Sequence, residues 1–229
     1  MSSSFHLHPS AFHPYAFPSA AYFGRMLAKG KIYERATMTS ALKAKFVNQI
    51  EKIVWQYKLS PETINLLATA AVPEIQVFNI LLKGDDIDEI LLRTIDQVIP
   101  FPIYFQLIKQ GKVKVKAAYK HPSGTNKDNW LIEPYLETEW MNLDTDTNPL
   151  PIALDLEKLY ALMLQSLIPS EIVEQSPQSS IKEQVDRLSQ YKITKKAYNR
   201  LKAKRDSEKQ FNRKVELNAQ LKIIKKELE

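Results

Sequence analysis

Three glutamates and one glutamine are the residues whose types and spacing best fit catalysis. Nucleases that depend on Mg²⁺ need two or three carboxylates that converge at the end of a strand, with a Lys or Gln nearby to position water. Glu51 and Glu62 precede the apolar segment from Glu74 to Lys83, and the pair Glu74-x-Gln76 begins it. A metal-dependent nuclease would therefore use Glu51, Glu62, Glu74 and Gln76. In the alternative interpretation, Glu74 only begins a strand and Glu51 is a solvated helix residue.

Other catalytic patterns are missing from the sequence. The chain has no cysteine, which excludes disulfides, thiolate zinc sites and a cysteine nucleophile and fits a reducing cytoplasm. The five glycines are scattered singly and form no phosphate-binding loop. His121 is the only histidine beyond the first 21 residues, and His6, His8 and His13 have no carboxylate near them in sequence. We therefore expect no cofactor and no metal site, and we favour a protein that is not an enzyme.

Positive charge gathers near the end of the chain. Residues 179–229 hold fifteen Lys and Arg against seven Asp and Glu, a net charge of +8, whereas the preceding 178 residues hold seventeen against nineteen. Such asymmetry is typical of contact with nucleic acid or an acidic partner. No base-reading motif is visible, so binding to DNA phosphates would be independent of sequence. The candidate nucleic-acid-binding residues are Lys195, Lys196, Arg200, Lys202, Lys204, Arg205, Lys209, Arg213 and Lys214. A solvated lysine-rich helix would have a similar composition.

The same segment has the pattern of a coiled coil. From Ile181 onward the chain has no Gly or Pro, and near its end apolar residues recur at alternating steps of three and four. A single helix of this length would extend about 74 Å. The residues from Ser207 to Gln210 match a capping box, so a second helix could begin there and form a hairpin. The candidate partner-binding residues are Phe211, Leu217, Leu221, Ile224 and Leu228, and their partner helix could belong to this chain, to a second copy in a homodimer, or to another protein.

The preceding residues predict a mixed domain of helices and strands. Apolar spacing predicts a helix from Thr39 to Lys58 and another that begins at Asp85–Asp88. The segment from Glu74 to Lys83 is apolar on both faces, as in a central strand. A β-hairpin is expected around Gln110-Gly111, followed by a strand from Trp130 to Trp140 and a helix from Leu154 to Pro169.

These elements define an α+β fold with a small mixed sheet and packed helices. We expect a flexible leader over residues 1–21, an α+β domain over 22–170, and a basic coiled-coil helical region over 179–229. The longest apolar run, from Ile99 to Ile108, is far shorter than a membrane span and contains two prolines. We therefore expect a cytoplasmic protein with no membrane partner.

Several segments resemble the bacterial family known as domain of unknown function 4391. The resemblance rests on "KIYERATMTSALKAKFVNQIEKIVWQYKLSPETINL", "EIQVFNILLK", "IDQVIPFPIYFQL", "YLETEW" and "EKQFNRKVELNAQLKIIKKELE". The family resemblance implies an accessory protein encoded beside helicase-like ATPases and DNA methyltransferases of restriction or phage-defence type. It supplies no catalytic residues.

The sequence and the resemblance together predict a non-catalytic accessory subunit of such a restriction or phage-defence system. The α+β body would bind a helicase-like ATPase or DNA methyltransferase, and the basic C-terminal region would bind the partner or the DNA backbone. The metal-dependent nuclease remains the alternative.

Overall fold

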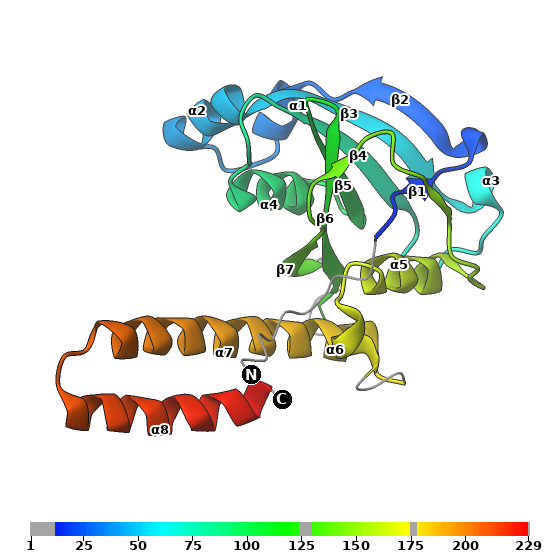
Figure 1. Cartoon of the computed structure of the whole chain (residues 1–229). Helices are drawn as coiled ribbons and strands as arrows, with labels where there is room; N and C mark the ends of the chain where they lie inside the picture. The colour runs from blue at the N-terminus through cyan, green and yellow to red at the C-terminus, as the bar shows by residue number, and fades with distance from the viewer. Residues whose placement is uncertain (1–11, 124–129, 175–177, 229) are drawn as a thin grey trace.

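A mixed β-sheet forms the centre of the protein (Figure 1). The computed structural model describes residues 12–123, 130–174 and 178–228. The main sheet has the strand order β2-β3-β4-β5-β6-β7, with β8 also paired to β6. Its parallel pair is β4 with β5, and its other pairs are antiparallel. The strands are β2 (Tyr22–Met26), β3 (Ile50–Leu59), β4 (Ile75–Leu82), β5 (Ile103–Lys109), β6 (Lys112–Pro122), β7 (Trp130–Glu137) and β8 (Met141–Asn142). A separate short pair joins β1 (Tyr15–Ala16) to β9 (Asn148–Pro149).

Helices cover both faces of the main sheet (Figure 1). The helical elements are η1 (Ser19–Ala21), α1 (Lys29–Tyr33), α2 (Ser40–Gln49), α3 (Pro61–Ile64), α4 (Glu89–Val98), α5 (Leu156–Gln165), α6 (Ser170–Glu174), α7 (Ile181–Ser207) and α8 (Phe211–Leu228). One core lies between the sheet and helices α1, α2 and α4, and the other between the sheet and α5, α6 and the start of α7. Strand β4 contributes Val77 to one core and Phe78 to the other, because successive side chains point to opposite faces.

The predicted α+β class, with packed helices and a helical C-terminus, is confirmed. The expected central strand is β4, and the expected β-hairpin joins β5 to β6. At its turn Gln110 and Gly111 have φ angles of 47° and 73°, which are the positive values of a tight type I′ turn. Within the described ranges, no helix has the length and apolar character needed to cross a membrane.

The predicted helix from Thr39 to Lys58 is wrong in its second half. Thr39 does cap α2, since its hydroxyl accepts a hydrogen bond from the backbone N–H of Leu42 at 3.1 Å. The chain leaves the helix at Ile50 and continues as β3, between β2 and β4. The segment "IEKIVWQYKL" is rich in β-branched and aromatic residues, which favour a strand once neighbouring strands are available.

The described part of the leader is docked on the body, which corrects the expectation of flexibility for residues 12–21. Tyr15 is 8% exposed, and its hydroxyl donates to the Ser166 hydroxyl at 2.9 Å. Phe17 stacks on Tyr57 with ring centroids 4.8 Å apart. Met1–Ala11 lie outside the described residues.

The C-terminal region forms a helical hairpin rather than one long helix (Figure 1). Helix α7 ends at Ser207, and the Glu208 carboxylate accepts the backbone N–H groups of Lys209 and Gln210 at 2.8 and 3.0 Å. The Ser207 hydroxyl instead donates back to the carbonyl of Lys204 at 3.0 Å. The break therefore depends on Glu208 and not on the predicted Ser207 cap.

Candidate nucleic-acid interface

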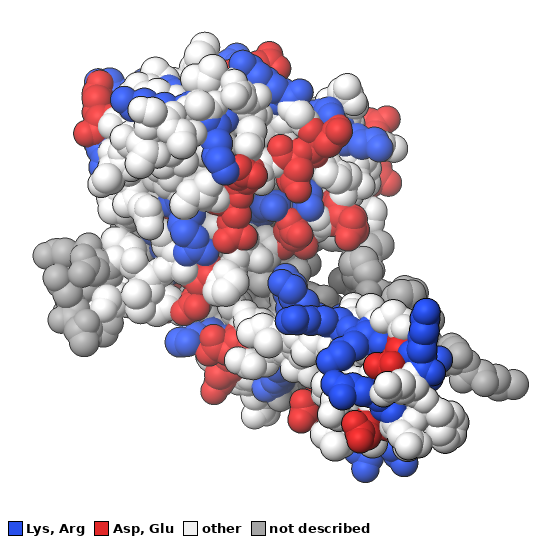
Figure 2. Space-filling view, turned by 90° about the vertical axis from the view of Figure 1, so that its left-hand side faces the viewer, with Lys and Arg blue, Asp and Glu red and all other residues white. Residues whose placement is uncertain are grey.

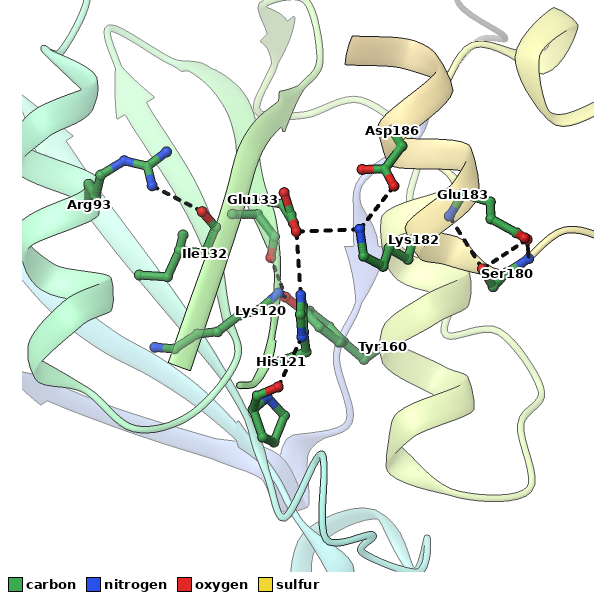
Figure 3. Close-up of polar contacts among 12 residues, drawn as sticks. Arg93, Lys120, His121, Ile132, Glu133, Tyr160, Ser180, Lys182, Glu183 and Asp186 are labelled. Carbon is green, nitrogen blue, oxygen red and sulfur yellow. Dashed lines mark hydrogen bonds and ion pairs between the residues drawn. The ribbon is translucent and has the colours of Figure 1, made fainter. Parts of the chain in front are cut away.

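The start of α7 is anchored to the body, so the hairpin has a fixed base. Val185 and Leu188 are buried in the core shared with α5. Lys182 lies 2.9 Å from Asp186 on its own helix and 3.9 Å from Glu133 on β7 (Figure 3). The boundary expected near residue 179 is therefore not a boundary in the packing, because the first turns of α7 belong to the core of the body.

The apolar stripe of α8 packs against α7 of the same chain. Leu217 and Leu221 are each only 5% exposed, and Ile224 and Leu228 are half-buried. Across the contact, Arg205 on α7 donates to the side-chain carbonyl of Asn218 at 3.4 Å. The partner helix for this stripe is thus α7, which was one of the three sources left open by the sequence.

Phe211 differs from the other candidate partner-binding residues because it is 78% exposed. Val215 and Ile223 on the same helix are also exposed, and the three side chains recur at multiples of four residues. Each step of four residues turns by about 40° around a helix, so such residues form a row that slants across its surface. A slanted apolar row therefore crosses the side of α8 that does not contact α7, and we call Phe211, Val215 and Ile223 the outer strip.

Most of the predicted nucleic-acid-binding cations are exposed on the hairpin. Figure 2 shows blue side chains gathered on the hairpin at the lower right, whereas Lys, Arg, Asp and Glu are intermixed on the body above it. Along α7, Lys192, Lys196 and Arg200 recur every four residues and are exposed, so they follow one side of the helix. In the part of the chain that the structure describes, no carboxylate lies within ion-pair distance of Lys192, Lys196, Arg200, Lys202, Lys209 or Lys214.

Three of the remaining cations of the set have close neighbours, and Lys204 is exposed. Arg205 is paired with Asp206, and Arg213 lies 3.9 Å from the Glu208 carboxylate. Hydrogen bonds from the backbone N–H groups of Gln210 and Lys209 lower the pKa of Glu208, and the positive charges of Arg213 and Lys204 add to this effect. The Lys195 ammonium lies 5.4 Å from the centre of the Tyr191 ring. Arg205 and Arg213 are therefore locally compensated, whereas the cations without a carboxylate in reach extend along α7 and continue at Lys209 and Lys214.

The structure brings Glu74 and Gln76 into contact, places Glu62 within the influence of Lys58, and separates Glu51 from all three. Gln76 donates to the Glu74 carboxylate at 2.6 Å, and Lys58 lies 2.9 Å from the same carboxylate. A hydrogen bond from the Ser60 hydroxyl lowers the pKa of Glu62, with smaller contributions from a backbone N–H and the charge of Lys58. Glu51 is exposed near the opposite end of β3, about 25 Å along the strand. Among the described residues, no group of three or more His, Cys, Asp or Glu could hold a metal ion.

Sequence reasoning missed a buried polar cluster under β7. The Lys120 ammonium donates to the backbone carbonyls of Asp96 and Ile99, both at 2.5 Å, and Tyr135 donates to the Asp96 carboxylate. Burial raises the pKa of Asp96 to about 6, although the charge of Lys120 opposes this effect. The two carbonyls belong to the end of α4, where a cation is stabilising. The cluster therefore fixes α4 to the sheet. The sequence did contain a signal for this cluster, because both charged residues lie within apolar patterns. Lys120 follows the apolar residues of its strand, and Asp96 directly follows Ile95 in its helix.

The fold and the hairpin define a class of protein: a mixed sheet covered by helices, from which a basic helical hairpin projects. The chain belongs to the family described as Domain of unknown function (DUF4391), whose model matches residues 16–228. A search of the curated proteins and a search of the solved structures found no match.

Proposed function

We propose that this protein is a non-catalytic accessory subunit that binds the DNA backbone through α7 and a larger protein partner through the outer strip of α8. The partner suggested by the family resemblance is a helicase-like ATPase or DNA methyltransferase of a restriction or phage-defence system. A cytoplasmic location is part of the proposal, and the lack of cysteine supports it.

The observation that carries the proposal is the row of exposed cations on α7 that have no carboxylate partner among the described residues. A cation without a counter-charge in its own chain can neutralise a phosphate and release a bound counterion, which makes the affinity depend on salt. Contact with phosphates alone does not distinguish sequences. Binding should therefore be weak, independent of sequence and sensitive to ionic strength.

The outer strip supports the second half of the proposal. Exposed apolar residues that line up on one helix face form the surface that a partner helix covers. Phe211 is the most exposed of the three, and an aromatic side chain contributes much of the energy of a typical interface. The lysines that flank the strip on α8, such as Lys222 and Lys226, favour a partner surface with acidic residues.

Fluorescence anisotropy with a labelled DNA duplex tests the first half. The wild type should lose affinity as the salt concentration rises. The double variant Lys196→Ala/Arg200→Ala should bind more weakly, with a salt slope reduced by about 2, because each phosphate contact contributes about 0.9. The matched control is Lys52→Ala/Lys112→Ala, which removes two exposed cations from the body. Equal losses in both double variants would contradict a role for the hairpin.

A pull-down with the purified partner tests the second half. Phe211→Ser should reduce capture of the partner and leave DNA binding unchanged. Leu143→Ser is the control, since Leu143 is a half-exposed apolar residue on the body. Undiminished capture by Phe211→Ser would remove the outer strip from the proposal.

The metal-dependent nuclease is tested separately with DNA and Mg²⁺. An inactive wild type makes the nuclease hypothesis unnecessary. If the wild type cleaves DNA, Glu74→Ala distinguishes the cause, since cleavage that survives this substitution is not due to the predicted site.

A further inference from the structure

A cleft lies at the base of the hairpin, between α7 and the body. Its volume is about 440 Å³, which is enough for one nucleotide base. Apolar side chains from distant parts of the sequence line it, including Phe12, Met141, Ile168, Leu188 and Tyr191. The cleft thus combines an apolar interior with two aromatic rings.

Several polar groups at the cleft already form hydrogen bonds with other residues of the protein. The Ser166 hydroxyl donates to the Met163 carbonyl and accepts from Tyr15, and the Thr138 hydroxyl accepts from Val115 and donates to the Glu139 carbonyl. Burial raises the pKa of Glu137, but hydrogen bonds from Lys116 and Lys114 outweigh it and the net pKa is lowered.

Two charged groups at the cleft remain without a partner in the described part of the chain. These are the exposed carboxylate of Glu139 and the exposed ammonium of Lys192. A carboxylate only accepts hydrogen bonds and an ammonium only donates them. A ligand that fits both offers a hydrogen-bond donor, N–H or O–H, and an anion within one small unit.

The row of cations from Lys192 to Arg200 begins at this cleft. Lys192 lines it, and Lys196 and Arg200 continue the row away from it, each about 6 Å further along the helix axis. A polyanion that entered the cleft with one unit could therefore follow the row with the next. A positively charged track beside aromatic rings is the arrangement by which proteins bind single-stranded nucleic acid.

We propose that the cleft binds one base of a single-stranded nucleic acid, and that the base has an exocyclic amino group, as cytosine and adenine do. The base would displace the Lys195 ammonium from the Tyr191 ring and stack there. It would also donate to the Glu139 carboxylate, while its phosphates would contact Lys192 and Lys196. Thymine has an acceptor where cytosine has its amino group, so it cannot donate to Glu139 in this way. The inference rests on the proposed function and narrows its ligand from DNA in general to a single strand.

The test compares oligonucleotides of about 15 nucleotides, a typical length for one binding site. Labelled oligo(dC), oligo(dT) and a duplex are titrated with the full chain at pH 8 by fluorescence anisotropy. We expect oligo(dC) to bind about 10-fold more tightly than oligo(dT), which corresponds to one additional hydrogen-bonded base contact. Glu139→Gln should bring the two affinities close together without changing the salt slope.

Tyr191→Leu keeps an apolar side chain at the base of the hairpin but removes the ring. It should weaken single-strand binding about 10-fold and leave duplex binding unchanged, because base stacking on an aromatic ring is worth about 1–3 kcal/mol. If this variant fails to fold, Glu139→Gln still decides the question, since Glu139 is exposed.

The outcomes separate this inference from the proposed function. Equal binding of oligo(dC) and oligo(dT), with no effect of either substitution, overturns the inference. Duplex binding without any preference for single strands overturns it too, but leaves the proposed function intact. If no nucleic acid binds at low salt, both fail.

Discussion

Lys182 on α7 lies 3.9 Å from the carboxylate of Glu133 on β7, and this contact joins the hairpin to the edge of the sheet. His121 on β6 lies 3.4 Å from the same carboxylate. Half of the Lys182 side chain is exposed, whereas Val185 and Leu188, one and two turns further on, are buried. Apolar burial therefore fixes the hairpin, and the ion pair adds a weaker contact at its base.

A double-mutant cycle on this pair should give a small coupling energy. Ion pairs between partly exposed groups are weakened by solvent, so the coupling between Lys182→Ala and Glu133→Gln should be about 0.2–1 kcal/mol. Urea unfolding of the wild type, both single variants and the double variant measures it. A coupling well above this range would mean that the pair, rather than the apolar contact, holds the hairpin.

Leu217→Ala should loosen α8 without unfolding the body. Leu217 is buried between the two helices, and loss of a buried leucine side chain costs about 2–5 kcal/mol. Hydrogen exchange should accelerate in α8 and remain slow in β4. Val215→Ala is the control, because Val215 is 52% exposed on the same helix. Similar exchange rates in the two variants would contradict the packing of α8 on α7.

Asp96→Asn should alter how stability depends on pH. The pKa of Asp96 is about 6 in the folded protein, above its ordinary value of 3.8, because the carboxyl is buried. Between about pH 4 and pH 6 the unfolded chain has lost this proton and the folded protein keeps it, so the free energy of unfolding should fall as pH rises, by about 3 kcal/mol. Asp96→Asn should lack this contribution.

The measurement for Asp96 is the urea midpoint at several pH values. Asp144→Asn, at an exposed aspartate after β8, serves as the control and should have the same pH dependence as the wild type. The interpretation would be wrong if the difference between wild type and Asp96→Asn were constant between pH 4 and pH 6.

Gly111→Ala should destabilise the protein by about 1 kcal/mol, since φ is +73° and side chains other than that of glycine are strained there. Gly84→Ala is the matched control. Gly84 lies in a loop after β4, and an added methyl group at this position would meet no heavy atom within 4 Å. Equal urea midpoints for the two variants would argue against the tight turn between β5 and β6.

The local signals predicted much of the fold. The apolar segment of β4 has no polar face, so only a central strand covered on both sides suits it. The expected β-hairpin is also present, with Gln110 and Gly111 at its turn between β5 and β6.

Strand β3 could not be predicted because its apolar residues do not alternate. Its pairing with β4 shifts register between Ile50 and Lys52 and again between Trp55 and Tyr57. Each irregularity adds a residue and breaks the period of two. Ile50 and Ile53 thus lie in the same core three positions apart, which imitates a helix.

The sequence predicted which segment carries the positive charge of the candidate interface. It did not predict how the two helices and the cleft residues are arranged. The excess of Lys and Arg over Asp and Glu identified the basic segment from composition alone. Its positive charge could be expected at the surface, because lysines without nearby acids remain exposed on a helix. The partner of the α8 stripe depends on where the helix breaks, and this is decided by the Glu208 carboxylate and its two backbone contacts. Glu139 and Tyr191 could not be associated from sequence, since the fold alone brings β7 beside α7.

If α7 binds a duplex as we propose, the length of this helix limits how much of the duplex one molecule can cover. Beyond Tyr191 the helix continues to Ser207, a reach of about 24 Å. At 3.4 Å per base pair, this corresponds to a footprint of about seven base pairs, less than one turn of the double helix. Under the proposed function, one copy would thus contact less than one turn of DNA, which is too little to encircle the duplex or clamp it.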